Sequence, residues 1–318
     1  MSFQTLAKSL KNDELAKCLL ECLAVNYSIK PTGLLAAMKD GAAVNEAAIR
    51  QIQFYFPQAF SVTSFSHTID NVGKHFEFRV LDKFIMYWTA MFSNSPAVRL
   101  AWKDRTGKAM RSHSNTRWWS QFEMMKQVFE YYGDVEPFLG ENDHLAPATR
   151  GHLLELFNNQ NDATDLKLEL AALIDWGVHF VTGTYNLEGD GPLVFTCYEH
   201  LSTIVNAISV GSFPNVEALA CQRADGDQRL FNEFTVQAKA CINPGFGFFQ
   251  QKFSNEFHSV VRALRSARLC CPIQVQQLRP TAASVEELRN FSFLDDDATI
   301  ASLVYELPRY LAKQMAFK

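Results

Sequence analysis

Only two short segments of this sequence have the pattern of β-strands, which restricts the chain to mostly helical folds. Leu34–Met38 is an apolar run that fits a buried strand ending at Asp40, and Phe60–Thr63 alternates as a second short strand. Residues 45–56 and almost all of the sequence beyond residue 80 show apolar residues at helical spacing. The sequence therefore predicts a small mixed α/β region over residues 1–82 and a large all-helical region over residues 83–318.

The composition indicates a folded protein with a substantial core. Of the 318 residues, 47% are hydrophobic and 26 are Phe, which excludes disorder because a disordered chain has low hydrophobicity and high net charge. No run approaches the ~18 uninterrupted apolar residues of a membrane span, and the first residues lack the apolar core of a secretory signal. Seven cysteines without a dense framework are typical of reduced thiols, so we expect an intracellular protein without a membrane span.

Two separate candidate features follow the two predicted strands. Asp40 follows the first strand, with Asn45 five residues later, and His67 lies shortly after the second strand. Carboxylates at strand ends are common metal ligands in nucleases, because the strand fixes them while the tip stays open. The ordinary alternatives are that Asp40 is a turn residue and that His67 is a hydrogen-bonded packing residue.

A third candidate feature is a basic segment over residues 99–119. A net charge of −4 excludes a generally basic nucleic-acid-binding surface, so contact with DNA requires a local patch such as this one. Arg and Lys pair with phosphates, and an exposed Trp stacks on an unpaired base. The candidate DNA-binding residues are Arg105, Lys108, Arg111, Arg117, Trp118 and Trp119. The alternative, equally favoured by the sequence, is that one or both tryptophans are core residues and that the charges form a solvated helix face.

Signatures of other enzyme classes are absent from the sequence. It contains no phosphate-binding P-loop, no glycine-rich dinucleotide motif, no serine-hydrolase elbow and no zinc-protease motif. Cys18 and Cys22 lie four residues apart without a paired His nearby, which argues against a zinc site. No small-molecule substrate is evident.

The order of the motifs resembles that of hAT-type transposases, in particular the transposon-derived branch of that family. The resemblance extends over nearly the whole chain. It includes Asp40 with Asn45, Phe65-Ser66-His67-Thr68, Phe92-Ser93-Asn94-Ser95, Thr116-Arg117-Trp118-Trp119-Ser120, the loop from Glu188 to Leu193, and Glu306-Leu307-Pro308 with Tyr310-Leu311. It implies a truncated RNase H-like catalytic remnant over residues 1–82, a helical insertion domain over residues 83–318, and a location in the nucleus.

The same resemblance implies two-metal phosphodiester chemistry, in which two Asp and one Glu hold Mg²⁺ ions. Asp40 matches the second of these acids, with Asn45 as a supporting position. His67 matches the His of a Cys-x-x-His motif, whose Cys is replaced here by Ser64. Arg117 and Trp118 match an Arg-Trp motif whose Trp stacks on a flipped or hairpin-end base.

The sequence also departs from the family at the catalytic acids. No strand ending in Asp precedes the helical pattern at residues 12–28, and the block that carries the final Glu is not found in this chain. Asp40 alone cannot position two metal ions, so we expect no cofactor for the chain as written and a metal at Asp40 only if the other acids are supplied. We therefore expect a catalytically incomplete transposase-like protein with residual DNA binding. The alternatives are a helical module that binds other proteins, such as another transposase-like chain, and a non-functional fragment of an element.

Overall fold

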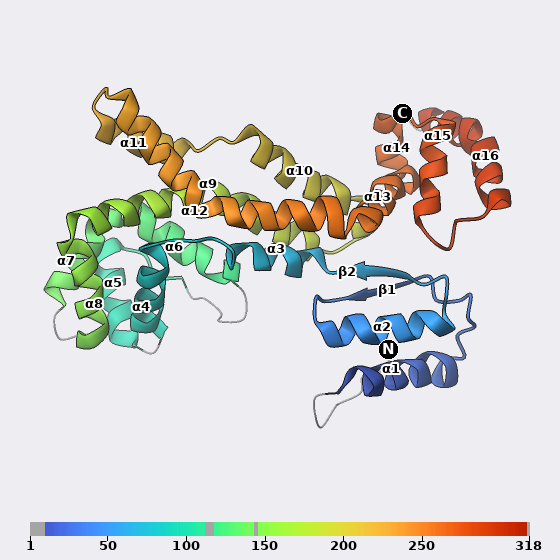
Figure 1. Cartoon of the computed structure of the whole chain (residues 1–318), viewed down its shortest axis with the longest axis horizontal. Coiled ribbons are helices and arrows are strands. Elements are labelled where there is room, and N and C mark those ends of the chain that lie inside the picture. The colour runs from blue at the N-terminus through green and yellow to red at the C-terminus, as the bar shows by residue number, and fades with distance from the viewer. Residues whose placement is uncertain (1–9, 94, 112–117, 143–145, 317–318) are drawn as a thin grey trace. The chain divides into compact units, whose positions relative to one another are not determined.

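The computed structural model describes residues 10–93, 95–111, 118–142 and 146–316, and the chain divides into two compact units. Unit 1 contains Met1–Thr68, Leu187–Leu201 and Gln251–Lys318, whereas unit 2 contains Ile69–Asn186 and Ser202–Gln250. The described residues are mostly helical, which confirms the prediction of a mostly helical chain (Figure 1). The division differs from the expected boundary between residues 82 and 83, because the C-terminal helices belong with the N-terminal strands.

Unit 1 contains a two-stranded parallel sheet. Strand β1 (Ala36–Lys39) pairs with β2 (Phe60–Thr63) in a register that runs from Ala36 opposite Phe60 to Lys39 opposite Thr63. Helix α2 (Ala43–Tyr55) connects the strands, as a parallel pair requires a crossover. Both strands were predicted from the sequence, the second with its observed bounds, and these predictions are confirmed.

One face of this sheet is covered by the N-terminal helices (Figure 1). Helix α1 (Asn12–Leu20), continued by the π-helical segment η1 (Glu21–Asn26), packs on α2. Ile52 and Phe56 of this layer are almost fully buried and share a cluster with Ala37 of β1. The remainder of the cluster consists of Ile49, Ala59, Leu19, Leu20, Leu23, Ile29 and Leu34.

The opposite face is only partly covered. Partners in a parallel register point to the same side, so Ala36, Met38, Phe60 and Val62 share this face. The Phe60 ring packs edge-on against Phe291 with centroids 5.2 Å apart, whereas Met38 is 78% exposed. The β2 half of the face is therefore half-buried, whereas the β1 half is open.

The residues that pack on β2 come from the C-terminal part of the chain. Phe60 packs against a hydrophobic cluster formed by α13 (His258–Ala267), α15 (Ala282–Glu286), the 3₁₀ segment η6 (Glu287–Asn290) with Phe291, and α16 (Asp297–Ala316). The 3₁₀ segment η5 (Arg268–Cys270) and helix α14 (Pro272–Leu278) belong to the same part of the chain. The Ser292 hydroxyl donates to the Gln58 carbonyl at 2.8 Å across 234 positions of sequence. This hydrogen bond is one of the contacts by which residues 251–318 pack within unit 1.

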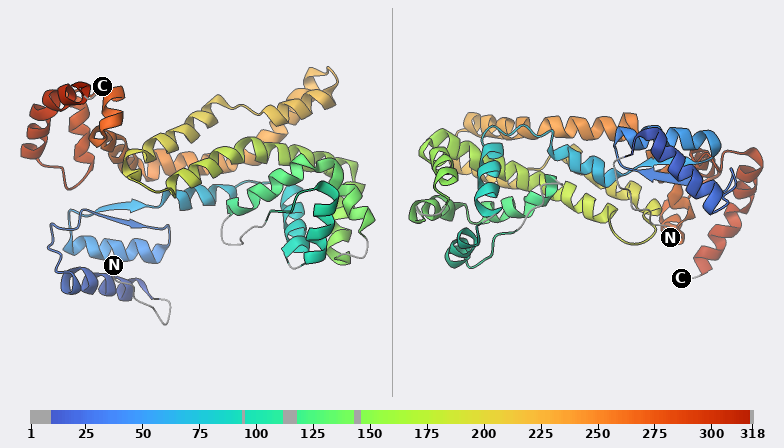
Figure 2. Two further views of the ribbon diagram at one scale, coloured as in Figure 1. Left: turned by 180° about the vertical axis from the view of Figure 1, so that it is seen from behind. Right: turned by 90° about the horizontal axis from the view of Figure 1, so that it is seen from below.

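Unit 2 is built around the long helices α9 (Gln160–Leu187) and α12 (Gln228–Gln251), which lie side by side in both views of Figure 2. The Phe76 ring contacts Trp118, Trp119, Phe180 and Phe246 at centroid distances of 5.7–6.5 Å. The helices that lie wholly in this unit are α4 (Leu81–Ser93), α5 (Pro96–Thr106), α6 (Phe122–Glu130), α7 (Tyr132–Glu141), α8 (Pro147–Asn158) and α11 (Pro214–Ala224). Helices α3 (Phe65–Gly73) and α10 (Cys197–Val210) each contain residues of both units. All five tryptophans of the sequence lie in unit 2, so tryptophan fluorescence reports on this unit alone.

Two buried carboxylates of α9 hold the starts of other helices. Glu169 accepts the backbone N–H groups of Arg79, Val80 and Leu81 at 2.7–3.0 Å, at the start of α4. Asp175 accepts the N–H groups of Asn215 and Val216 at the start of α11. Both carboxylates thus satisfy N–H groups that a helix leaves without partners in its first turn.

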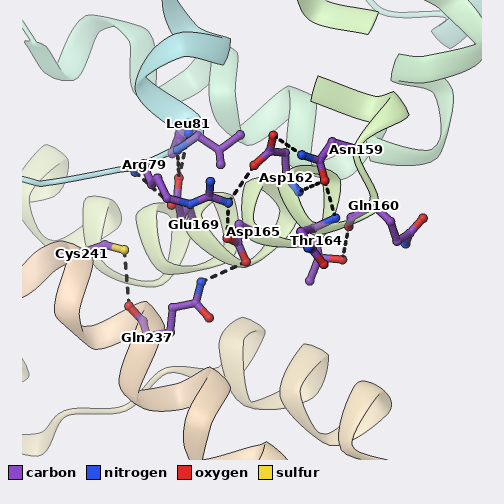
Figure 3. A network of polar contacts seen from close by, with 12 residues as sticks. Arg79, Leu81, Asn159, Gln160, Asp162, Thr164, Asp165, Glu169, Gln237 and Cys241 are labelled. Carbon is purple, nitrogen blue, oxygen red and sulfur yellow. Dashed lines mark hydrogen bonds and ion pairs between the residues drawn. The ribbon is translucent and has the colours of Figure 1, made fainter. Parts of the chain in front are cut away.

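The Glu169 contact belongs to a wider polar network (Figure 3). The Arg79 guanidinium pairs with Asp162 at 2.8 Å and with Asp165 at 2.5 Å. Gln237 of α12 donates its amide to Asp165 at 2.9 Å. The network links the start of α4 and the two central helices, so it has a structural role within unit 2.

Burial of acids in unit 2 predicts an unusual dependence of its stability on pH. Glu169 and Asp175 are 1% and 6% exposed, and burial raises the pKa of both carboxyl groups above their ordinary values. Above the ordinary pKa of these acids the folded state therefore binds more protons than the unfolded state, so stability falls as the pH rises. We expect the urea midpoint of tryptophan fluorescence to decline as the pH rises above about 4, less steeply in Asp175→Asn. A midpoint that rises equally in both proteins would contradict this account.

One helical stretch within the described residues, Cys197–Ala224, is long and apolar enough to cross a membrane by length and composition, with a mean hydropathy of 1.2 in its most apolar window. In the structure this stretch is divided into α10 and α11 at Gly211, whose φ is +64°. A single stretch of this kind is a weak indication of a membrane span.

Candidate functional site

The structure brings together the residues predicted at the strand ends. Because β1 and β2 are parallel, Asp40 and His67 follow strands that end at the same edge of the sheet. Asn45 donates its side-chain amide to Asp40 Oδ1 at 2.6 Å, and the Ala42 N–H donates to the same oxygen at 2.9 Å. The His67 ring lies beside Gly41, where a Cβ would be 3.4 Å from His67 Cδ2.

These hydrogen bonds favour the ionised form of the Asp40 carboxylate and hold it in position. The N–H of Ala42 and the amide of Asn45 lower the pKa of Asp40, and the charge of His67 adds a smaller effect in the same direction. Asp40 is therefore ionised at neutral pH and exposed at the sheet edge. Its bonds to the start of α2 also give it a capping role, because the N-cap residue Ala42 has no side-chain acceptor.

Few of the described side chains at this edge of the sheet could act as metal ligands. Ser64 and Ser66 share a hydrogen bond at 3.0 Å, and Ser64 occupies the position at which the resemblance expects the Cys of the Cys-x-x-His motif. Among the residues that the structure describes, no group of three or more His, Cys, Asp or Glu side chains could hold a metal ion.

The basic segment is partly neutralised by acids from other helices. Arg105 pairs with Asp134 at 3.1 Å and with Glu141 at 2.6 Å, both on α7. Lys108 pairs with Glu130 of α6 at 2.7 Å. Counting charges along residues 99–119 misses these acids, because they follow later in the sequence. Thr116 and Arg117 of the Arg-Trp motif, like Asn94 of the preceding motif, lie outside the described residues.

The two tryptophans have different surroundings. Trp119 is only 6% exposed, donates its indole N–H to the Ile69 carbonyl at 2.8 Å and stacks on Phe180. The expectation that Trp119 contacts DNA is therefore corrected: its ring belongs to the core of unit 2, where it cannot stack on a base. Trp118 is half-buried against Gly73, where a Cβ would lie 2.0 Å from the indole, so a side chain larger than hydrogen does not fit there.

A groove of about 610 Å³ borders the basic segment in unit 2. One side is formed by residues 108–111 and the other by α6. The cations Lys108, Arg111 and Lys126 line it together with Glu123 and Glu130. Sequence reasoning identified the first two cations but missed Lys126, because the α6 sequence was interpreted only as an amphipathic helix.

Gln127 of α6 holds the two sides of this groove together. Its side-chain oxygen accepts the N–H of Arg111 at 3.1 Å, and its amide donates to the Ala109 carbonyl at 3.2 Å. The Gln127 side chain is buried, so these bonds are protected from water. The backbone of the basic segment is therefore fixed beside α6 while its charged side chains stay exposed.

Comparison with models of known protein families finds no match for this chain. Comparisons with curated proteins and with solved structures find no match either.

Proposed function

We propose that this chain is a hAT transposase-like protein that binds the phosphate backbone of DNA at the groove between residues 108–111 and α6, and that it does not cut the DNA. The observation that carries the proposal is the convergence of Lys108, Arg111 and Lys126 on one groove, against two acids. Lys and Arg side chains that line a groove are suited to phosphates spaced along a backbone. The segment with the Arg-Trp motif of the resemblance follows this groove directly in the sequence.

The pairing of Lys108 with Glu130 does not prevent phosphate binding. Both side chains are more than half exposed, and an exposed ion pair contributes only about 0–1 kcal/mol. A phosphate can therefore replace Glu130 at small cost. Because Trp119 is buried, we expect contacts with the backbone to dominate, so that binding depends strongly on salt and weakly on base sequence.

The strand-end residues support the part of the proposal that concerns cleavage. Asp40 is committed to the start of α2 through Ala42 and Asn45, which gives this carboxylate a structural role without any metal. We expect a labelled DNA hairpin to remain intact when it is incubated with the protein and Mg²⁺ or Mn²⁺. Specific nicking of the hairpin that is lost in Asp40→Asn would contradict the proposal.

The binding itself is tested by fluorescence anisotropy of the same hairpin at low salt. We expect the double variant Arg111→Glu/Lys126→Glu to bind at least tenfold more weakly than the wild type. The matched control is Lys83→Glu/Arg229→Glu, which changes the net charge equally at exposed positions outside the groove. An equal loss in both double variants would contradict a role for the groove, as would no binding by well-folded wild-type protein.

A second candidate function is protein binding through the sheet of unit 1. In the part of the chain that the structure describes, β1 pairs only with β2, which leaves its other edge without a strand. Beside this edge, Leu35 is 52% exposed and Met38 is 78% exposed. Edges of this kind pair readily with other strands. This function is distinguished from DNA binding by an assembly that persists at high salt and is lost in Met38→Lys.

A further inference from the structure

Unit 1 contains a hollow of about 570 Å³ among its C-terminal helices. Its floor is formed by Val285 of α15 and Leu288 of η6, which are both 4% exposed. Leu303 and Leu307 of α16 form a wall, and Leu269 and Cys270 of η5 complete the lining. The volume lies within the range of about 300–1,000 Å³ that is usual for small-molecule sites.

The apolar part of this pocket belongs to a packed core. Val285 and Leu288 share a hydrophobic cluster with Ala267, Phe291 and Ile300, against which Leu269 and Leu307 also pack. Buried side chains in such a cluster are held by many neighbours, so the floor does not need a ligand to form. The pocket is therefore a preformed aliphatic surface.

Charged side chains of α16 lie at the rim of the pocket. Glu306 and Arg309 approach each other to 3.8 Å, the long end of ion-pair distances, and Lys313 follows one turn later. Among the described residues that line the pocket, two cations thus face one acid. The rim therefore favours a ligand with a single negative charge. A ligand with several negative charges would find too few cations to pair with and would be repelled by Glu306.

We propose that this pocket binds an aliphatic monocarboxylate, with the hydrocarbon chain on the leucines and the carboxylate beside Arg309 and Lys313. The lining favours a ligand with a hydrocarbon chain over one with a ring system, because Tyr310 is the single aromatic side chain among the described residues that line the pocket. The site uses none of the residues of the DNA groove, and this inference goes beyond the proposed function.

Calorimetric titration of the whole chain with dodecanoate, below its micelle concentration, tests the proposal. We expect one site, with affinity that falls about tenfold for each two methylenes removed from the chain, because each buried methylene contributes a nearly constant free energy. Dodecanol should bind more weakly than dodecanoate, and dodecyltrimethylammonium more weakly still. Equal affinity for dodecanoate, dodecanol and dodecyltrimethylammonium would overturn the proposal that Arg309 and Lys313 bind the carboxylate.

Variants test the rim and the wall separately. Lys313→Glu should weaken dodecanoate binding at least tenfold while changing dodecanol binding little. Arg262→Glu is the matched control, because it reverses an exposed charge on α13 outside the pocket. Leu303→Trp places bulk in the cavity from a partly exposed position and should weaken both ligands. Retention of wild-type affinity in both Lys313→Glu and Leu303→Trp would show that the ligand binds elsewhere.

Thiol alkylation locates the ligand directly. Cys270 and Cys221 are both exposed, but Cys270 lines the pocket and Cys221 of α11 lies outside it. We expect saturating dodecanoate to slow alkylation of Cys270 and to leave Cys221 unchanged, as measured on peptides by mass spectrometry. Protection of neither thiol, or of both equally, would contradict the proposed site. Failure of DNA binding would leave these results unaffected, so the two proposals are tested independently.

Discussion

Replacing Glu169 with alanine is expected to lower the free energy of unfolding of unit 2 by about 3–5 kcal/mol. The variant leaves the N–H groups of Arg79, Val80 and Leu81 without their acceptor at a place where Glu169 is 1% exposed. Loss of a helix cap costs about 0.5–2 kcal/mol, and each buried donor left unsatisfied adds about 1–3 kcal/mol before the structure relaxes. Urea unfolding followed by tryptophan fluorescence measures the effect, because every tryptophan lies in unit 2.

Two further variants separate the Glu169 contacts from general effects of substitution. Glu169→Gln keeps the shape and one acceptor oxygen, so we expect a smaller loss than for alanine. Glu155→Ala removes a carboxylate of α8 whose side chain is 75% exposed, and it should change stability by less than about 0.5 kcal/mol. A loss below 1 kcal/mol for Glu169→Ala would show that the three hydrogen bonds do not hold α4 in place.

Replacing Trp119 with alanine is expected to cost unit 2 about 3–5 kcal/mol, the usual effect of removing a large buried aromatic side chain. The indole fills space beside Phe76 and Phe180 and donates to the Ile69 carbonyl, which would lose this partner. The four remaining tryptophans still report unfolding. The control is Tyr185→Ala on α9, where the side chain is 66% exposed and a small effect is expected.

The Trp119 variant also separates packing from DNA contact. Under conditions in which the folded protein still predominates, we expect Trp119→Ala to bind the DNA hairpin with nearly wild-type affinity. A variant that is as stable as the wild type but has lost DNA binding would contradict the core assignment and favour base stacking by this ring.

Local features of the sequence were enough to predict both strands. The run at Leu34–Met38 and the alternation at Phe60–Thr63 are short-range patterns, and the helical segment between them favours a parallel crossover. Neither strand prediction required contacts between distant parts of the chain. The bond from Asn45 to Asp40 is also local in the sequence, whereas the closeness of Asp40 and His67 comes from the parallel pairing of the strands.

Features that depend on distant contacts could not be predicted in this way. The packing of Phe60 on Phe291 joins opposite ends of the chain, and no local pattern distinguishes it from a contact within residues 1–82. Two adjacent tryptophans likewise do not reveal which of them is buried. Trp119 is the core residue because Ile69 and Phe180, far away in the sequence, supply its partners. The acids Asp134 and Glu141 neutralise Arg105 for the same reason.

The salt dependence of hairpin binding tests the central claim most directly. Each phosphate contact contributes about 0.7–0.9 to the slope of log affinity against log salt, so three cations in the groove predict a slope of about −2 to −3 for the wild type. In Arg111→Ala/Lys126→Ala we expect the slope to become shallower by about 1.5–2, while Lys83→Ala/Arg229→Ala keeps the wild-type slope. A slope that is near zero, or that is the same in both double variants, would contradict phosphate binding in this groove.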